Sequence, residues 1–88
     1  MKVEFLSKFN KDLDDIHIPF VRKAILEAIL DVENAKSIYT VRGIKKMSGF
    51  KNCYRIRTGD YRIGLFYEKG IVQFARVVHR KDIYKVFP

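Results

Sequence analysis

The sequence predicts an α+β fold, in which an N-terminal strand and a two-helix hairpin pack on an antiparallel β-sheet meander. Apolar residues recur at every third or fourth position up to residue 32, and at every second position from residue 54 to residue 67. The first spacing is typical of one face of a helix, and the second is typical of one face of a strand. Because the helices precede the strands and do not alternate with them, the order favours α+β over a parallel α/β sheet.

The first helix is expected to follow a short strand at residues 2–5, and Ser7 is placed to be its N-cap. One face of this helix has apolar residues at steps of three, four and three, namely Leu6, Phe9, Leu13 and Ile16. The opposite face is expected to be solvated, and it carries Lys8, Lys11, Asp12 and Asp15.

The second helix is expected to begin at Pro19, because proline lacks an N–H group and the first turn of a helix needs none. A wide apolar face follows, which Leu26 and Leu30 widen further, so the polar stripe opposite is narrow. A helix this apolar is expected to be covered on more than one side, by the first helix and by the sheet.

Three strands are predicted in the second half of the chain, after an irregular stretch that contains Gly43 and Gly49. Two alternating strands flank a turn at residues 58–60, and a second turn at residues 69–70 leads to an apolar strand over residues 71–78. A short tail then ends the sequence, and we expect it to make few contacts with the core.

Length and composition limit the class of protein. The 88 residues have room for one domain, residues 1–88, and a hydrophobic content of 48% excludes a disordered chain. We find no apolar run of the ~18–20 residues that span a membrane, and no signal peptide. The single cysteine, Cys53, cannot form an internal disulfide and is expected to be a small buried residue. These features predict a cytoplasmic protein without a membrane partner.

The positive charge is confined to one half of the sequence. The net charge is +8; residues 1–40 hold six basic and seven acidic residues, whereas residues 41–88 hold twelve basic and three acidic ones. Such an asymmetry predicts that the second half binds a polyanion or an acidic protein, and it does not choose between them.

Several arginines are expected to share one face of the predicted sheet. The core residues of the strand around residue 55 are its tyrosine and isoleucine, so Arg55 and Arg57 point the opposite way. The hairpin brings Arg57 close to Arg62, and Arg80 can reach the same region. Like charges facing each other across a hairpin are destabilising, whereas guanidinium groups bind phosphate in a bidentate manner. The grouping favours a bound anion over a solvated face whose acidic partners are Asp60, Glu68 and Asp82.

Two side chains near these arginines are candidates for proton transfer. His79 directly precedes Arg80, and histidine is the side chain that ordinarily changes its charge near neutral pH. Tyr84 follows Arg80 by four residues, so one helical turn would put both on the same side, where cations help a phenol to give or take a proton. The alternative for Tyr84 is a tail residue packed on the sheet.

Phe66 lies on the same predicted face as Arg62 and has two interpretations. It is either a platform on which a base stacks or part of a small cluster that covers the sheet. The sequence has no zinc-ligand cluster, no phosphate-binding glycine loop and no paired carboxylates. We therefore expect neither a metal nor a cofactor, and metal-dependent nuclease chemistry is disfavoured.

Two segments resemble the RelE/ParE superfamily of bacterial and archaeal toxins. They are residues 53–63, CYRIRTGDYRI, and residues 78–84, VHRKDIY. The similarity extends over essentially the whole chain, including the helical hairpin and residues 46–49. The resemblance implies a RelE-like fold and a toxin that a co-expressed antitoxin neutralises by forming a hetero-oligomer with it.

The RelE branch of this superfamily implies a specific reaction. Its toxins enter the ribosomal A site and cleave messenger RNA without a metal, through attack of the 2′-OH on the adjacent phosphate. Arg62 and Arg80 match two arginines of the well-studied toxin, and Tyr84 matches its C-terminal tyrosine. Further contacts to RNA are expected from Lys45, Lys46, Lys51, Phe66 and Lys81.

The sequence departs from that toxin at Arg55 and Arg57, which stand where it has two lysines. A lysine can act as a base, whereas an arginine effectively cannot, because it stays protonated. His79 or Tyr84 would then take the proton, or the reaction would depend on positioning and charge stabilisation alone.

Two other functions remain open from the sequence. Toxins of the ParE branch bind DNA gyrase and are not nucleases, and they resemble this chain in fold and in the strand motif. The third possibility is a basic module that binds ribosomal RNA without cutting. The tyrosine that follows the histidine–arginine pair favours the RelE branch.

Overall fold

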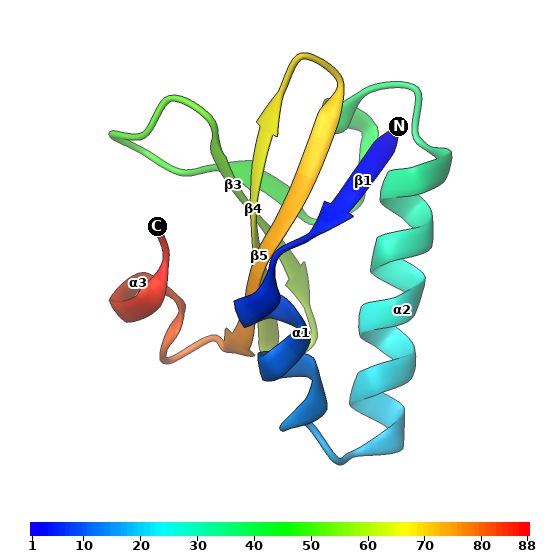
Figure 1. The fold of residues 1–88 in the computed structure, drawn as a ribbon, viewed down its shortest axis with the longest axis vertical. Helices are drawn as coiled ribbons and strands as arrows, with labels where there is room; N and C mark the ends of the chain where they lie inside the picture. The colour runs from blue at the N-terminus through cyan, green and yellow to red at the C-terminus, as the bar shows by residue number, and fades with distance from the viewer.

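Five strands and three α-helices make up the structure, a computed structural model that describes residues 1–88 (Figure 1). In chain order the elements are β1 (Lys2–Phe5), α1 (Ser7–Asp14), α2 (Pro19–Asn34), the 3-10 helix η1 (Ile38–Thr40), β2 (Ile44–Lys46), β3 (Cys53–Thr58), β4 (Tyr61–Glu68), β5 (Ile71–His79) and α3 (Ile83–Val86). The strands form one sheet in the order β1-β5-β4-β3-β2. Strands β2 to β5 form an antiparallel meander, and β1 joins its edge parallel to β5. The predicted α+β class is confirmed.

Two elements, η1 and β2, lie inside the stretch that was expected to be irregular. The three residues of β2 are too few to show an alternating pattern, but they pair with β3, with Ile44 opposite Ile56. Gly43, directly before β2, has a positive φ of 76°, and a Cβ there would lie 2.8 Å from the carbonyl oxygen of Arg57. Only glycine lets the chain approach β3 so closely at this point.

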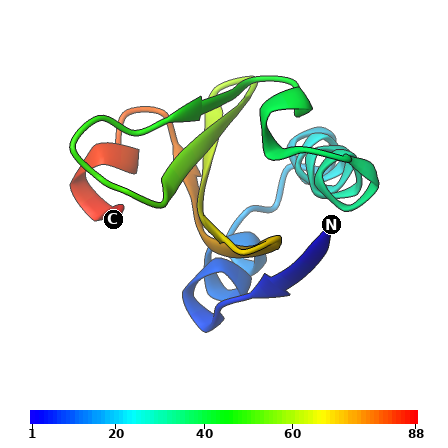
Figure 2. The same ribbon diagram turned by 90° about the horizontal axis from the view of Figure 1, so that it is seen from above.

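Helices α1 and α2 cover one face of the sheet, and helix α3 lies on the other side (Figure 2). Helix α1 packs on β5, while α2 contacts β1 and β3. No helix has both the length and the apolar sequence that a membrane span requires. The main core lies between these helices and the sheet; its fully buried side chains include Phe9, Ile25, Val32, Ile56, Ile63, Leu65, Val72 and Phe74.

Only one side of α2 is buried, so the expectation that this helix is covered on more than one side is wrong. Its buried residues are Ile25, Ile29 and Val32. Leu26 and Leu30, on the outer side, are 56% and 47% exposed. The physical reason is the shortness of α1, which spans eight residues and packs on β5. The outer side of α2 is left as an apolar surface in contact with water.

Helix α1 departs from the prediction at two residues. Leu6, and not Ser7, is the N-cap residue, and no side chain caps the helix. Asp12, expected to be solvated, is half-buried: its carboxylate accepts hydrogen bonds from Arg76 Nε at 2.7 Å and from Arg76 Nη2 at 3.0 Å. It also accepts one from the N–H of Val77 at 3.1 Å. This bidentate pair, which raises the pKa of Arg76, fastens α1 to β5.

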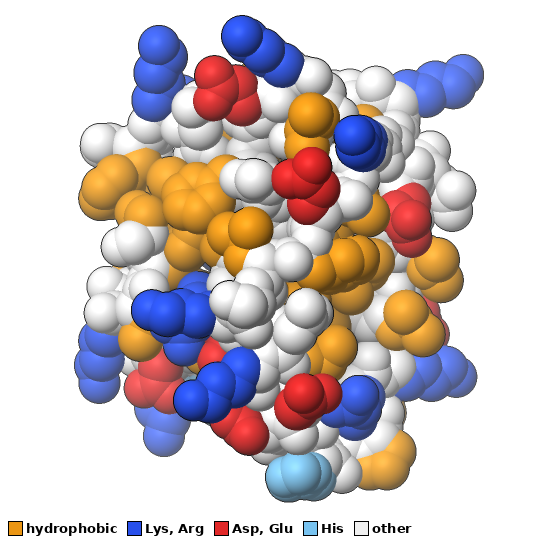
Figure 3. All heavy atoms as spheres, in the orientation of Figure 1, with side chains coloured by type: hydrophobic (Ala, Val, Ile, Leu, Met, Phe, Trp, Pro, Cys, Tyr) orange, Lys and Arg blue, Asp and Glu red, His pale blue; other side chains and the backbone are white.

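The C-terminal tail has a small core of its own on the second face of the sheet. Ile83 and Phe87 are buried there, together with Met47, Cys53 and Ala75. Figure 3 shows hydrophobic side chains gathered on the side of the molecule where the tail lies. The expectation of few core contacts is therefore wrong for the tail as a whole, although Arg80 and Tyr84 are themselves exposed. Cys53 is buried as predicted, and burial raises the pKa of its thiol.

The pair between Asp12 and Arg76 yields a prediction about stability. Asp12→Ala leaves the half-buried guanidinium of Arg76 and the N–H of Val77 without their acceptor, so the free energy of unfolding should fall by about 2–3 kcal/mol. Asp14→Ala is the matched control, because Asp14 is an exposed residue of the same helix, and it should change stability by less than about 0.5 kcal/mol. Urea denaturation measures the free energy of unfolding of both variants. Equal values for Asp12→Ala and Asp14→Ala would contradict the stabilising role of the Asp12–Arg76 pair.

Candidate functional site

The β3–β4 hairpin places two arginines directly opposite each other. In its antiparallel register Arg57 is the partner of Arg62, and Ile56 is the partner of Ile63. The isoleucines are buried in the main core, so the arginines lie on the other face of the sheet. Gly59, with a φ of 59°, forms the turn between the strands. The predicted proximity of Arg57 and Arg62 is confirmed.

Arg62 lies at the centre of a group of four guanidinium groups. Burial lowers its pKa first, and the nearby charges of Arg55, Arg57 and Arg80 lower it further. Tyr84 acts on the same pKa in the opposite direction, and its side chain lines a pocket together with Arg55. The structure thus brings together five of the six residues that the sequence suggests for chemistry. We call Arg55, Arg57, Arg62 and Arg80 the arginine face.

Backbone carbonyl groups hold two of these side chains in place. Arg62 Nη1 donates to the carbonyl oxygens of Gly59 at 2.8 Å and Tyr61 at 2.9 Å. Arg55 Nη1 donates to the carbonyl oxygen of Gly43 at 3.1 Å, and that oxygen also accepts the N–H of Arg57 at 3.0 Å. Gly43 therefore supports the site, a role that the sequence pattern did not indicate.

Acidic residues neutralise little of the arginine face. Arg80 Nε lies 4.0 Å from Asp60 Oδ1, and both side chains are more than half exposed, so this pair contributes little. Glu68 accepts a hydrogen bond from Asn52, and Asp82 pairs with Lys85 at 3.8 Å. Only one of the three acidic residues considered as partners thus pairs with an arginine of this face. The positive charge remains available to an anion.

A small pocket of about 250 Å³ lies beside the arginine face, between the β2–β3 loop and α3. Tyr84, 69% exposed, and Arg55 line it together with Lys45, Lys46, Met47, Ser48 and Phe50. Lys45 is paired with Arg55 across β2 and β3, so their side chains share a face. Met47, Ser48 and Phe50 were not suggested as site residues, because the stretch before β3 shows no period from which their direction could be predicted.

His79 does not lie on the arginine face, contrary to the expectation that it stands beside these side chains. It pairs with Tyr61 across β4 and β5, and the two rings meet edge to face with centroids 5.7 Å apart. Tyr61 packs against the main core, so His79 points to the helix-covered face. Its Nδ1 accepts the backbone N–H of Lys81 at 3.2 Å. The cause is the alternation of the strand, which sends successive side chains to opposite faces.

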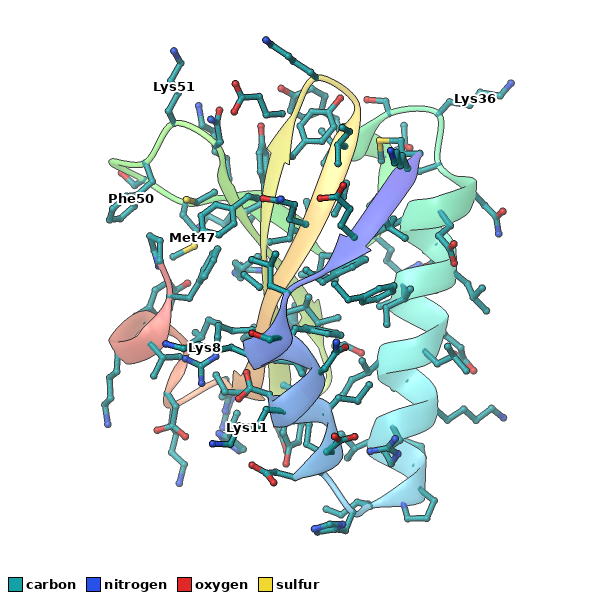
Figure 4. All side chains as sticks on the ribbon, in the orientation of Figure 1. Lys8, Lys11, Lys36, Met47, Phe50 and Lys51 are labelled. Atoms are coloured by element: carbon teal, nitrogen blue, oxygen red, sulfur yellow. The ribbon has the colours of Figure 1, made fainter.

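The remaining RNA-contact candidates lie outside this pocket. Phe66 packs against Phe87 with ring centroids 5.1 Å apart, so it belongs to the cluster that covers the sheet, and its ring remains partly exposed. Lys51 lies in the β2–β3 loop and points away from α3 (Figure 4). Lys81 is exposed in the turn between β5 and α3.

Comparison with known proteins places this chain among toxins. The model of a family described as the ParE toxin of type II toxin–antitoxin systems matches residues 3–84. Toxin RelE3 of Methanocaldococcus jannaschii is 44% identical over 90 residues, covering 100% of both chains. The crystal structure of the RelB–RelE antitoxin–toxin complex from Methanococcus jannaschii is 40% identical, with a TM-score of 0.81 over 97% of this chain and 99% of that chain. The intact E. coli RelBE complex shares the fold at 21% identity, with a TM-score of 0.69 over 89% and 94% of the two chains.

The crowding of charge on the arginine face yields a prediction about stability. Arg57→Gln removes one of two like charges that face each other, so the free energy of unfolding should rise by a few tenths of a kcal/mol, up to about 1 kcal/mol. Lys36→Gln is the matched control, because it removes the same charge from an exposed residue beyond the C-terminal end of α2 (Figure 4). Thermal unfolding at low salt measures both, and a destabilised Arg57→Gln variant would contradict this account of the face.

Proposed function

Because the chain belongs to the RelE/ParE superfamily of type II toxin–antitoxin toxins, we propose that it is a ribosome-dependent endoribonuclease that cleaves messenger RNA in the cytoplasm. The observation that carries the proposal is the arginine face, whose four guanidinium groups have one weak acidic partner. Such a group of fixed positive charges is suited to an anion that gains charge during a reaction.

The proposed reaction is transfer within the RNA backbone. The 2′-oxygen of one nucleotide attacks the adjacent phosphorus, and the bond from phosphorus to the 5′-oxygen of the next nucleotide breaks. The products are a 2′,3′-cyclic phosphate and a 5′-hydroxyl group. The phosphoryl oxygens carry extra negative charge in the transition state, and Arg62, with its neighbours Arg55 and Arg57, stabilises that charge.

Tyr84 is the group we propose for proton transfer. The arginines stay protonated and cannot accept the proton of the 2′-OH. His79 lies on the opposite face of the sheet, beside Tyr61. The exposed phenol of Tyr84 lies near Arg62. Its O–H donates a proton to the departing 5′-oxygen, and the phenol oxygen takes up the proton that the 2′-OH releases, so the phenol is regenerated.

The shape of the site supports a requirement for the ribosome. The pocket beside Tyr84 is small, about 250 Å³, and Arg55 is the only residue of the arginine face that lines it, so Arg57, Arg62 and Arg80 lie outside this hollow. In-line attack needs a 2′-oxygen held in position, which contributes a large part of the rate of such reactions. We propose that the ribosome holds the messenger in this conformation, and that Lys45 and Lys46 bind its phosphates.

The second partner we propose is a cognate antitoxin, in keeping with the RelB–RelE complex that this chain resembles at 40% identity. The apolar outer side of α2 continues into a groove between α1 and α2, which Leu13, Ile25 and Leu26 help to line. An acidic amphipathic segment would place apolar anchors in this groove and cover part of the arginine face.

Gyrase inhibition is the second candidate function, and the matching family model, described by the ParE toxin, favours it. A gyrase inhibitor would use a surface for protein binding and would need no proton donor at position 84. DNA breaks that depend on gyrase, with messenger RNA left intact, would select this function. A basic module that binds ribosomal RNA without cutting would give neither result.

Arg80→Ala and Tyr84→Phe should abolish most cleavage while the protein stays folded. Both side chains are exposed, and loss of one transition-state donor costs roughly 10²–10³ in rate. Primer extension on a translated messenger measures the cuts, which should vanish when translation initiation is blocked. Circular dichroism checks the fold of each variant.

Tyr39→Phe is the matched control for Tyr84→Phe. Tyr39 is 74% exposed and packs on Tyr54, a residue of the helix-side core, so it lies away from the arginine face. The Tyr39→Phe variant should therefore cleave at the wild-type rate. A Tyr84→Phe variant as active as this control would remove Tyr84 from the mechanism.

The product of the adjacent reading frame should co-purify with this chain. Part of the complex should weaken with salt, because charge attraction is screened, while the contact with the apolar side of α2 should persist. Leu26→Asp puts a charge into that contact and should lower the affinity at low and at high salt alike. Retention of the partner by Leu26→Asp at both salt concentrations would place the antitoxin elsewhere.

A further inference from the structure

We infer that Phe87, seated over Gly64, positions Tyr84 for the reaction, an inference that rests on the proposed nuclease function and deepens it. Neither residue belongs to the arginine face. Phe87 is the residue after α3, and Gly64 lies in the middle of β4. Their contact joins the C-terminal tail to the strand that carries Arg62.

The contact between Phe87 and Gly64 leaves no room for a side chain at position 64. A Cβ there would lie 2.6 Å from two ring carbons of Phe87, closer than such atoms approach each other. The ring of Phe87 is 4% exposed and meets Phe66 at 5.1 Å between centroids. Gly64 does not have a positive φ, so the space above it, and not its φ, is what requires glycine here.

Helix α3 depends on this contact for its position. It is a single turn of four residues, and a turn of this length has no stability of its own in water. Its two buried anchors are Ile83 and Phe87, which flank the exposed Tyr84. The N–H of Phe87 donates to the carbonyl oxygen of Ile83 at 2.9 Å, which closes the turn. Because Tyr84 is itself 69% exposed, its position depends largely on these two buried neighbours.

The contact lies beside one arginine of the face, because Gly64 is the partner of Arg55 across β3 and β4, but it does not hold the guanidinium groups in place. Arg55 and Arg62 are held by the carbonyl oxygens of Gly43, Gly59 and Tyr61, none of which is in the tail. Loss of the Phe87 ring should leave the arginine face unchanged while Tyr84 becomes mobile. The expected result is a slower chemical step at nearly unchanged affinity for the programmed ribosome.

Single-turnover cleavage of a messenger bound to purified ribosomes tests the inference. Phe87→Ala should lower the maximal rate by about 10- to 100-fold, with the half-saturating toxin concentration unchanged within about twofold. Phe87→Leu, which refills the space, should restore most of the rate. Gly64→Ala should resemble Phe87→Ala, because its methyl group displaces the ring. Val86→Ala, the control in the same turn, should keep the wild-type rate.

A double-mutant cycle distinguishes positioning from a general loss of structure. If Phe87 acts through Tyr84, adding Phe87→Ala to Tyr84→Phe should cost little beyond Tyr84→Phe alone. If the rate losses of the two single variants multiply in the double variant, the inference is overturned. A Phe87→Ala variant that cleaves at the wild-type rate would overturn it as well.

Hydrogen exchange provides a readout that does not require activity. The N–H of Lys85 donates to the carbonyl oxygen of Asp82 at 3.0 Å, so this amide reports on the α3 turn. In Phe87→Ala its exchange should approach that of an open chain, while the amides of β4 stay protected. Unchanged protection at Lys85 would overturn the positioning role. A wild-type chain that does not cleave would overturn the proposed function instead. In that case the exchange rate of the Lys85 amide in Phe87→Ala still tests whether Phe87 holds α3 in place.

Discussion

The pairing of β3 with β4 determines where three of the four arginines of the arginine face lie, namely Arg55, Arg57 and Arg62. Side chains alternate along a strand, so burying Ile56 and Ile63 on the helix side necessarily places Arg57 opposite Arg62 on the other side. The repulsion between the two guanidinium groups costs a fraction of a kcal/mol to about 1 kcal/mol, whereas each fully buried isoleucine contributes roughly 1.5–3 kcal/mol. Packing of the core therefore maintains a concentration of charge that the arginines alone would oppose.

The two faces of the sheet are covered to different extents, and function follows from that difference. Helices α1 and α2 bury the centre of one face, and the Asp12–Arg76 pair fastens α1 to β5. On the other face the tail covers only the part around Gly64, and the arginines beside it stay open. The covered part places Tyr84 next to the open part. One short tail thus supplies both a second small core and the group proposed for proton transfer.

The sequence was sufficient to predict side-chain positions where the apolar alternation extends over a whole strand. It was insufficient where a position depends on contacts between distant segments. Alternation over β3 and β4 predicted the pairing of Arg57 with Arg62 without further information. Nothing local indicates that α1 is too short to cover Leu26, or that Gly64 serves to seat Phe87, 23 positions later. His79 shows the limit most clearly, because its place in the sequence next to Arg80 suggests proximity, while the strand turns its ring to the other face.

The central claim is that the arginine face stabilises a phosphate under attack by the neighbouring 2′-oxygen. The most direct measurement uses a ribosome-bound messenger with a single 2′-deoxynucleotide at the site of cleavage, compared with the all-ribose messenger. We predict that the substituted messenger binds equally well and is not cut at that position, while the unmodified one yields a 2′,3′-cyclic phosphate end. Cleavage of the deoxy-substituted messenger at the same position and rate would contradict the account.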